Sequence, residues 1–493
     1  MNFAEQFRRK VAESPKAMAI RFKDQQLSYE QLAARIEGYR SEFGSVKGMR
    51  VIILLPDSLE TYLFYLFLFL EEAVTIPLSV LLSGARIANV VERVQPHLIL
   101  TNELLHRTHQ DVLSATTCFL VGDLNVTQPC GFAWHMPGQK KSIQEVAKNG
   151  MPSNETVRMI IFTSGSTGIP KGVCLSESNL VSAAGMMVDF LPVMSATKSM
   201  VTVPLYDYYG LIQIFGHIIG GGGFMFGFSP AFAKQFHRVM HAENVTDLVL
   251  VPHTLRKLTD AAADVVTEGM RSLKRITTSS DILTEDLLVR TFQANPGVTV
   301  VNIYGLTEAG RACYRKIGAQ STFSKSIGRA SKGVEIVIEG EAGEPGEIII
   351  RGPNVMLGYF QRITDGRVEY KPYTEMRTGD LGYFDEAGEI VLLGRRDHMI
   401  NLMGAKIHPS EIEMAALKLN GIQEAKARVV REQAGDPTIH LDVVSVNGPL
   451  STEAIKEELR KTLPRMFVPT TITLVPEIAR TELGAKILRE KTA

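Results

Sequence analysis

The residues with the clearest chemical potential lie in one short segment, from Thr163 to Gly172. Its sequence is Thr-Ser-Gly-Ser-Thr-Gly-Ile-Pro-Lys-Gly, and it directly follows the apolar run MIIF at 159–162. Glycines allow backbone N–H groups to turn toward an anion, hydroxyls add donors, and Lys171 adds a positive charge. The segment is not a Walker A loop, because no Lys-Ser or Lys-Thr pair ends it at the required spacing. A polar surface loop is the alternative, and we favour a turn that binds the phosphates of a nucleotide.

Further segments rich in polar and glycine residues follow in a fixed order along the chain. They are YGLTE at 304–308, GEIIIRGPNVMLGYF at 346–360, RTGD at 377–380, GRRD at 394–397 with GAKI at 404–407, and TELGAKILR at 481–489. Together with residues 163–172 they resemble the signatures of the adenylate-forming superfamily. This superfamily contains acyl-CoA synthetases, the adenylation domains of peptide synthetases, and luciferase. The resemblance extends over nearly the whole chain.

The resemblance implies an ATP site. It gives Tyr304 as the surface for adenine, Thr307 as a donor to the α-phosphate, and Glu308 as a ligand of Mg²⁺, a hard cation that binds carboxylates and phosphates. It places Asp380 to accept both ribose hydroxyls, with Arg395 close by. The residues implied in ATP binding are Thr163, Ser164, Gly165, Ser166, Thr167, Gly168, Lys171, Tyr304, Gly305, Asp380 and Arg395.

The C-terminal motifs imply a catalytic lysine and a hinge. Lys486 would stabilise the charge that develops as pyrophosphate leaves, and it acts with Thr307 and Glu308 as the catalytic set. The chain departs from the family here, because Ala485 separates Lys486 from the preceding glycine. Asp397 resembles the hinge about which the small domain turns between its adenylating and thiol-transferring poses, a role that requires a large change in φ and ψ.

Two segments resemble the parts of the family that form the acyl pocket. The first contains Tyr206, Asp207 and Tyr208, and the second is Ser279, Ser280 and Asp281, where relatives commonly have a Gly-Gly pair. A carboxylate in a partly dry pocket is costly unless it is paired. Asp207 or Asp281 could therefore recognise a substrate amino group. Alternatively, the substrate is a simple acyl or aryl acid, and Asp207 is hydrogen-bonded to Tyr206 or a backbone amide.

Two further residues, Arg311 and Cys174, lie close in sequence to the predicted nucleotide-binding segments. Arg311 either contacts the substrate or makes a structural ion pair, and we favour the ion pair. Cys174, close after the glycine-rich loop, has no base near it in sequence. We interpret it as a packing residue.

The strands and helices that would position the candidate site residues are predicted to form an α/β fold. Short apolar runs at 51–55, 159–162, 201–204, 247–251 and 298–303 are each followed by helix-like segments. Such alternation predicts a mostly parallel sheet covered on both faces. From about residue 332, glycine and proline turns separate strand patterns, which predicts antiparallel hairpins. We expect a large N-terminal domain at 1–395 and a small mobile α+β domain at 396–493, with helices at 409–418 and 451–462.

Composition limits the partners and the cellular location that we expect for this protein. The 493 residues carry 53 basic and 53 acidic side chains, so the formal net charge is zero and no nucleic-acid or membrane partner is indicated. The apolar stretch at 61–70 is far shorter than the ~20 residues of a membrane span and predicts a core helix. The four cysteines form no CxxC pair, and the first residues show no apolar signal core. We expect free thiols and a cytoplasmic protein.

These features predict an ATP-dependent ligase that forms an acyl-AMP and pyrophosphate from a carboxylic acid. The acyl group would then pass to coenzyme A or to the phosphopantetheine of a separate carrier protein, since no carrier sequence follows Lys486. One alternative is an enzyme that activates amino acids and loads a carrier protein. Another is a catalytically impaired member of the fold, for which the insertion of Ala485 is the main argument. A luciferase-type oxygenase, a kinase and a nucleic-acid ligase are disfavoured.

Overall fold

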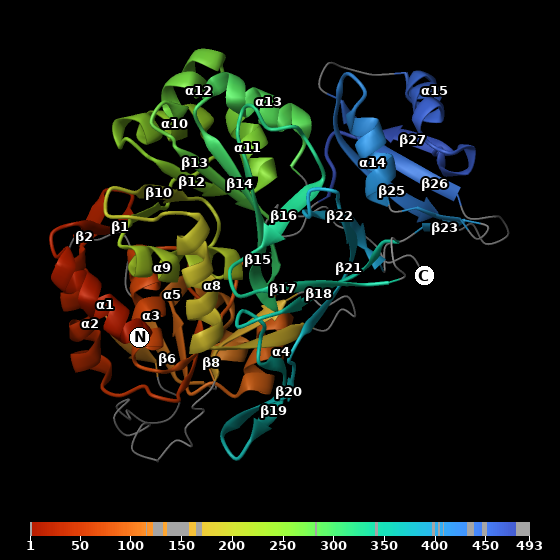
Figure 1. The fold of residues 1–493 in the computed structure, drawn as a ribbon. Coiled ribbons are helices and arrows are strands. Elements are labelled where there is room, and N and C mark those ends of the chain that lie inside the picture. Colours follow the sequence, from red (N-terminus) through yellow and green to blue (C-terminus); the bar gives the residue numbers. More distant parts are fainter. Residues whose placement is uncertain are drawn as a thin grey trace. The chain divides into compact units, whose positions relative to one another are not determined.

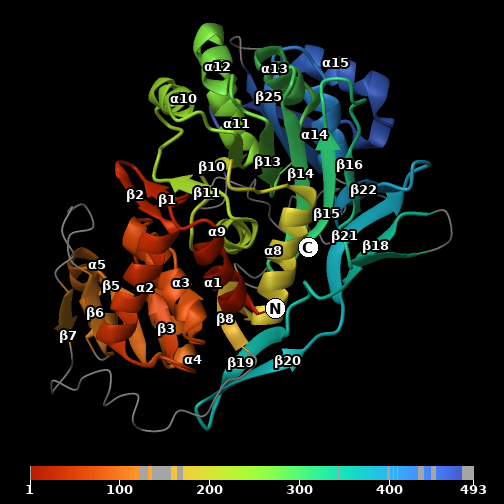
Figure 2. The same ribbon diagram turned by 60° about the vertical axis from the view of Figure 1, so that its left-hand side comes forward.

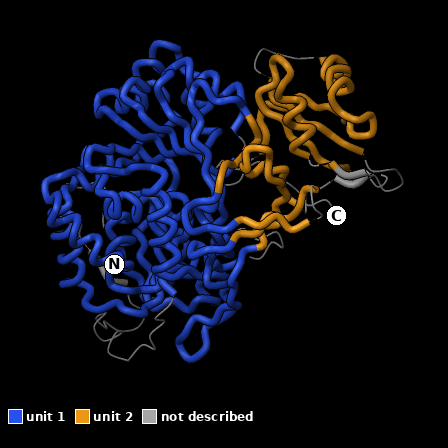
Figure 3. The backbone as a smooth tube through the Cα atoms, in the orientation of Figure 1, with its two compact units in different colours: residues 1–323, 330–335, 351–376 blue, residues 324–329, 336–350, 377–493 orange. Residues whose placement is uncertain are grey.

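The structure is a computed structural model. It describes residues 2–114, 116–121, 132–135, 157–163, 170–281, 283–340, 344–396, 400–402, 405–407, 409–430, 438–445 and 451–479. The chain folds into two compact units (Figure 3). Unit 1 comprises residues 1–323, 330–335 and 351–376, and unit 2 comprises residues 324–329, 336–350 and 377–493.

Unit 1 contains a sheet of nine strands in the order β20-β19-β9-β8-β4-β3-β5-β6-β7. Strands β4, β3, β5 and β6 run parallel, whereas β9 pairs antiparallel with β8. The strand bounds are β3 Arg50–Ile53, β4 Val74–Pro77, β5 Leu98–Thr101, β6 Cys118–Val121, β7 Phe132–His135, β8 Val157–Thr163, β9 Lys171–Ser176, β19 Gly358–Thr364 and β20 Arg367–Pro372. The helices that belong to this part are α1 Phe3–Glu13, α2 Tyr29–Phe43, α3 Leu59–Leu70, α4 Gly84–Val94, α5 Glu103–Thr108 and α6 Gln110–Leu113.

A second run of strands in unit 1 has the order β2-β1-β11-β10-β12-β13-β14-β15. The pairs from β1 to β14 are parallel, and β15 returns antiparallel to β14. The strand bounds are β1 Met18–Phe22, β2 Gln25–Ser28, β10 Lys198–Val201, β11 Gly223–Phe226, β12 Asp247–Leu250, β13 Arg275–Ser279, β14 Thr299–Leu306 and β15 Ala309–Ile317.

Helices cover both faces of this second sheet (Figures 1 and 2). Side chains of α10, α11, α12 and α13 pack with those of β10, β12, β13 and β14 in one apolar core. On the other face, Phe215 of α9 packs against Phe69 of α3 with ring centroids 4.5 Å apart. The helix bounds are α8 Glu177–Phe190, α9 Tyr208–Gly220, α10 Ala233–Ala242, α11 Pro252–Thr259, α12 Ala263–Met270 and α13 Glu285–Ala294.

The local signals of two predicted helices are confirmed. Ser28 caps α2 by accepting from the backbone N–H of Gln31, and the Gln31 side chain accepts from the Ser28 backbone. Helix α3 carries the apolar stretch and is buried from Leu59 to Phe69, as expected for a core helix. Among the described residues, no helix is long and apolar enough to cross a membrane.

Two details of the predicted strand pattern are wrong. Strand β10 ends at Val201, so the run at 201–204 is mostly loop. The runs at 159–162 and 298–303 are followed along the chain by β9 and β15, which pair antiparallel with β8 and β14, rather than by helices. The runs at 159–162 and 298–303 both lead into segments that the sequence analysis assigns to nucleotide binding.

Unit 2 combines an antiparallel section with a small α+β part. The section has the strand order β17-β18-β21-β22-β16, and β25, β26 and β27 form a separate sheet that packs with α14 and α15. The predicted helices at 409–418 and 451–462 are confirmed as α14 Pro409–Leu417 and α15 Thr452–Thr462. The remaining bounds are β16 Ser326–Ala330, β17 Glu335–Glu339, β18 Gly346–Arg351, β21 Met376–Phe384, β22 Ile390–Arg395, β23 Ile400–Leu402, β24 Ala405–Ile407, β25 Ile422–Val430, β26 Thr438–Ser445 and β27 Thr471–Leu474.

The fold is therefore the predicted mixed α/β fold, with large sheets, an antiparallel section and a C-terminal α+β part. The sequence analysis placed the boundary between a large domain and a small mobile domain at residues 395 and 396. That the part after residue 395 moves as a domain stays a proposal.

Candidate active site

The predicted phosphate-binding turn connects two paired strands. Thr163 ends β8 directly opposite Lys171 at the start of β9, and the Thr163 hydroxyl donates to the Lys171 carbonyl over 3.4 Å. Strands β8 and β9 pair antiparallel within the nine-stranded sheet. The remaining predicted residues of the turn lie outside the described part of the chain: Ser164, Gly165, Ser166, Thr167 and Gly168.

Arg93 of α4 contacts Pro170, the residue directly before β9. Its Nη1 donates to the carbonyl of Pro170 over 2.8 Å. Its guanidinium lies over the rings of Phe162 and Phe360, 5.3 Å and 5.4 Å from their centroids. Such stacking favours a cation with weak hydration. Nothing in the sequence pointed to Arg93, because it lies far from the loop along the chain.

Four residues of the predicted nucleotide site share one hairpin. Tyr304 and Gly305 lie near the end of β14, and Thr307 and Glu308 connect Leu306 to Ala309 at the start of β15. A side chain at position 305 would meet the backbone nitrogen of Arg311 at 2.7 Å, so glycine is required there. The hairpin thus brings the predicted adenine, phosphate and Mg²⁺ residues together.

The segment between β18 and β19 fixes this hairpin. Met356 donates its backbone N–H to the Glu308 carbonyl over 2.8 Å, and the Asn354 side chain donates to the Gly310 carbonyl over 2.8 Å. The Tyr359 hydroxyl donates to Oε1 of Glu308 over 2.9 Å, and Nζ of Lys171 lies 5.2 Å from the Tyr359 ring centroid. Tyr359 therefore connects the strand of Lys171 with Glu308, the predicted Mg²⁺ ligand. The motif at 346–360 is evident in the sequence, but the roles of Tyr359 and Asn354 emerge only from these contacts.

The residues present fit Mg²⁺ bound together with ATP. Mg²⁺ in proteins usually has one or two carboxylate ligands, with substrate phosphates and water filling the other positions. Glu308 is a half-buried carboxylate that Tyr359 orients through one oxygen. In the part of the chain that the structure describes, no group of three or more His, Cys, Asp and Glu side chains could hold a metal by itself.

The two predicted pocket segments converge beside this hairpin. Tyr206 and Asp207 lead into α9, which begins at Tyr208. The hydroxyl of Tyr209 donates to the Thr277 carbonyl on β13 over 3.1 Å. At the end of that strand, Ser279 Oγ donates to the Ile303 carbonyl of β14 over 2.8 Å. The segments at 206–208 and 279–281 are thus tied to neighbouring strands.

Ser280 adopts a backbone conformation that favours glycine. Its φ is +79°, in the left-handed region that costs a residue with a side chain about 1–2 kcal/mol. The neighbouring Asp281 is partly buried.

Asp57 is a partly buried carboxylate that sequence reasoning missed. Its two oxygens lie 3.2 Å and 3.4 Å from the backbone nitrogen of Leu205, which donates to them. Burial raises the pKa of Asp57 to about 6, although this hydrogen bond lowers it. Asp57 thereby holds the loop that carries Tyr206 and Asp207.

The predicted ribose residues come together within unit 2. Asp380 on β21 is paired in register with Arg395 on β22, and the Arg395 guanidinium lies 3.6 Å from an Asp380 oxygen. Nη1 of Arg395 also donates to the Thr378 carbonyl over 2.6 Å. Asp397 and Lys486, the predicted hinge and catalytic lysine, lie outside the described residues.

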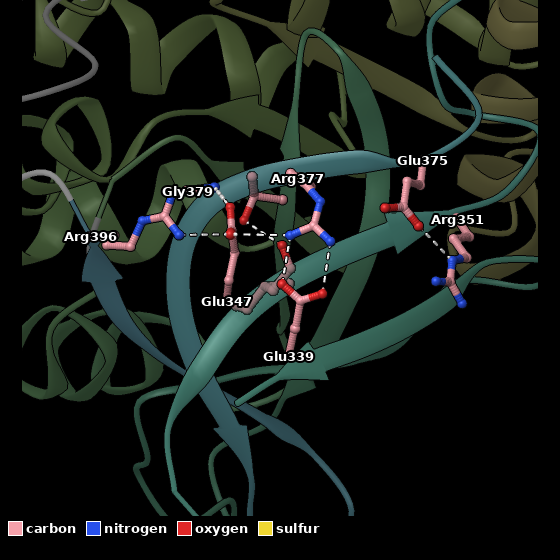
Figure 4. A network of polar contacts seen from close by, with 9 residues as sticks. Glu339, Glu347, Arg351, Glu375, Arg377, Gly379 and Arg396 are labelled. Atoms are coloured by element: carbon pink, nitrogen blue, oxygen red, sulfur yellow. Dashed lines mark hydrogen bonds and ion pairs between the residues drawn. The ribbon is translucent and has the colours of Figure 1, made fainter. Parts of the chain in front are cut away.

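Glu347 organises the residues around Asp380 (Figure 4). Its buried carboxylate accepts from the Gly379 backbone N–H over 2.9 Å and from Nη1 of Arg396 over 2.9 Å. Nη1 of Arg377 lies 3.7 Å from the same group. Glu347 therefore connects the residue before Asp380 with the end of β22.

The packing interpretation of Cys174 agrees with its surroundings. Its side chain is fully buried, and burial raises the pKa of the thiol to about 12. A thiol with a raised pKa is a poor nucleophile.

Comparison with known proteins places the chain in a family. A family model described as AMP-binding enzyme matches residues 7–360. The indoleacetate–CoA ligase of Aromatoleum aromaticum is 27% identical, over 98% of this chain and 96% of that protein. A probable non-canonical nonribosomal peptide synthetase of Salinispora arenicola, CymA, is 28% identical over 66% of this chain, which spans only 4% of that protein. The ATP-bound crystal structure of MatB from Rhodopseudomonas palustris superposes with a TM-score of 0.80 at 22% identity, covering 99% of this chain and 97% of that one.

The chain therefore belongs to the AMP-binding enzyme family, which confirms the resemblance drawn from the motifs. Its enzyme class is that of the AMP-forming acid–thiol ligases.

Proposed function

We propose that this protein activates a carboxylic acid with Mg-ATP and transfers the acyl group to the thiol of coenzyme A. The observation that carries the proposal is the β14–β15 turn. It presents Thr307 and Glu308 side by side, and Tyr359 connects Glu308 to the strand of Lys171. This arrangement suits a reaction that requires alignment and neutralisation of phosphate charge.

The first step joins the acid to the nucleotide. A carboxylate oxygen of the substrate forms a bond to the α-phosphorus, and the bond from that phosphorus to the bridging oxygen of pyrophosphate breaks. Thr307 donates to the α-phosphate, Glu308 orients the metal, and Asp380 holds the ribose. Mg²⁺ bound with ATP supplies charge neutralisation on the phosphates. Lys486 acts on the leaving pyrophosphate.

The second step transfers the acyl group. The C-terminal part turns about Asp397, Lys486 leaves the site, and the thiol attacks the acyl carbonyl. The thioester forms and AMP leaves. Coenzyme A is the proposed acceptor, since the chain spans 96% of a coenzyme A ligase but only 4% of a peptide synthetase. A separate carrier protein is the alternative acceptor.

We infer a cytoplasmic location from the thiols. Cys118, Cys174 and Cys313 are free and buried. Free thiols are typical of reducing compartments.

Exchange of labelled pyrophosphate into ATP tests the first step. The wild type should exchange label when it is given Mg-ATP and a suitable acid, and Lys486→Ala should exchange at least about 100-fold more slowly, the usual cost of removing one such electrostatic contact. Lys461→Ala is the matched control, since Lys461 lies on α15 and pairs with Glu458 over 2.6 Å. Equal exchange by the wild type and Lys486→Ala would remove Lys486 from the mechanism. Coenzyme A and a phosphopantetheinylated carrier, offered separately, decide the acceptor.

A further inference from the structure

Arg311 is a buried cation beside the candidate site, and it has no role in the proposed reaction. It lies on β15, three residues beyond Glu308, and its side chain is only 4% exposed. The position of a side-chain carbon at Gly305 would be 2.7 Å from the Arg311 nitrogen, so the two residues face each other across the hairpin. Its φ of +60° lies in the left-handed region, which marks a constrained backbone.

The surroundings of the Arg311 guanidinium are aromatic. Its central carbon lies 4.8 Å from the ring centroid of Tyr209. Tyr209 is the second residue of α9, whose first residue, Tyr208, belongs to the predicted acyl pocket. Tyr208 also packs closely on this strand, because a side-chain carbon at Gly310 would lie 2.1 Å from its hydroxyl. The guanidinium therefore lies where the pocket segment meets the nucleotide hairpin.

Two donor atoms of this guanidinium have no partner. Nε and Nη2 of Arg311 are buried, and no hydrogen-bond acceptor for either occurs among the described residues. The same part of the chain provides no Asp or Glu in an ion pair with Arg311. The structural ion pair that we favoured from the sequence is therefore not found. Sequence could not decide this point, because the partner of a buried charge depends on tertiary packing.

The chemistry of these atoms indicates what would satisfy them. An arginine keeps its charge in proteins, and an unpaired buried charge is strongly unfavourable. Nε–H and Nη2–H point in parallel from one edge of the guanidinium plane, and this edge matches the two oxygens of a carboxylate. A ligand that brings a carboxylate to this place would remove the cost of the unpaired charge. A substrate ammonium group there would instead add repulsion between like charges.

We propose that Arg311 determines substrate specificity by binding the second carboxylate of a dicarboxylic acid whose other carboxylate is adenylated. The inference rests on the proposed function and narrows its substrate class. Arg311 holds the distal end of the acid against the Tyr209 ring, and the reacting end lies toward the turn at Thr307 and Glu308. The amino group considered for Asp207 or Asp281 is disfavoured by the same unpaired cation.

Matched pairs of acids test the proposal by pyrophosphate exchange. Malonate, succinate, glutarate and 2-succinylbenzoate are each compared with the mono-amide of the same skeleton, and hexanoate and indoleacetate serve as monoacids. A charged hydrogen-bond pair corresponds to roughly 10- to 150-fold in kcat/KM, and at least one diacid should exceed its mono-amide by that factor. Arg311→Met should abolish this preference while leaving the monoacid rates unchanged. Arg311→Lys should retain part of it, because lysine supplies charge without the parallel donors.

Two controls separate specificity from folding. Arg315→Met, on the same strand, removes a guanidinium that donates to the Thr322 carbonyl over 3.1 Å and should leave the preference intact. The Tm of Arg311→Met should equal or exceed that of the wild type without ligand, because an unpaired buried charge is removed. The diacids alone should raise the Tm of the wild type and not that of Arg311→Met.

These experiments can contradict the role of Arg311 in substrate specificity without contradicting the proposed ligase function. If the wild type exchanges pyrophosphate with monoacids as fast as with diacids, or if Arg311→Met keeps a diacid preference, the inference is overturned and the ligase function stands. A Tm several degrees lower in Arg311→Met, without loss of selectivity, also overturns it in favour of a structural role. If no acid supports exchange, the proposed function fails, and the inference falls with it.

Discussion

The hydroxyl of Tyr359 donates a 2.9 Å hydrogen bond to a carboxylate oxygen of Glu308, and the ammonium group of Lys171 lies 5.2 Å from the ring centroid of the same tyrosine. One side chain on β19 thus contacts the two charges that the account assigns to ATP. It holds the acidic group in place and provides an aromatic face for the basic one.

Tyr359→Phe removes only the hydroxyl and so tests this connection. A hydrogen bond to a charged group contributes ~1.5–3 kcal/mol, and partial exposure reduces this value. We expect kcat/KM for ATP to fall roughly 5- to 50-fold and the Mg²⁺ requirement to rise. Tyr373→Phe is the control, because the Tyr373 ring contacts Tyr359 edge-on at 5.5 Å. Steady-state kinetics at several Mg²⁺ concentrations provides the measurement, and an unchanged Mg²⁺ dependence would contradict the role of Tyr359.

Arg93→Met tests whether the exit of the phosphate turn needs to be fixed. Methionine keeps an apolar side chain over the rings of Phe162 and Phe360 but cannot donate to the Pro170 carbonyl. We expect KM for ATP to rise about 5- to 20-fold with a smaller change in kcat, since one hydrogen bond to a backbone group is lost. Arg86→Met, at an exposed position of α4, should leave both constants unchanged. Equal kinetics in the two variants would show that Arg93 acts only in packing.

Glu347→Gln tests the network around Asp380. The substitution removes the charge that pairs with Arg396 and Arg377, and it keeps an oxygen for the Gly379 N–H. We expect a loss of about 1–2 kcal/mol in the free energy of unfolding of unit 2 and a higher KM for ATP, because the strand of Asp380, the proposed ribose residue, loses an anchor. Differential scanning calorimetry and ATP titration measure the two effects. Glu339→Gln alters only an exposed partner of Arg377 and should have little effect, as surface pairs contribute ~0–1 kcal/mol. Similar losses in both variants would contradict a special role for Glu347.

The raised pKa of Asp57 predicts how stability depends on pH. Because burial raises its pKa from 3.8 to about 6 in the folded protein, the folded state binds the proton more tightly than the unfolded state. The resulting stabilisation is complete below pH 3.8 and is lost as the pH rises through about 6. Asp57→Asn keeps an acceptor for Leu205 and removes the titration, so its stability relative to the wild type should increase between pH 4 and 7, by about 1–3 kcal/mol. Unfolding by urea at several pH values measures this difference, and a difference that does not change with pH would refute the shifted pKa.

Much of the fold and part of the site could be predicted from sequence because they depend on local patterns. The capping box at Ser28 and Gln31, the buried helix α3 and the helices α14 and α15 have signals within a few residues. The motif at 304–308 marked the residues that lie together at Thr307 and Glu308, but the hairpin that brings them together was not expected from sequence.

Other features depend on contacts between distant segments and could not be predicted. Arg93 meets Pro170, and Asp57 meets Leu205, only after two sheets and their helices have packed. For the same reason, sequence could not decide the partner of Arg311, and among the described residues no ion pair with it is found. The strand expected at 201–204 ends at Val201, and a loop held by Asp57 follows.

The central claim is that a carboxylate oxygen attacks the α-phosphorus of ATP. An acid that supports pyrophosphate exchange, labelled with ¹⁸O in its carboxyl group and converted with Mg-ATP and coenzyme A, tests this claim most directly by mass spectrometry of the nucleotide product. We expect AMP that contains one ¹⁸O atom, together with the acyl thioester. Unlabelled AMP, or ADP with label in free phosphate, would contradict it.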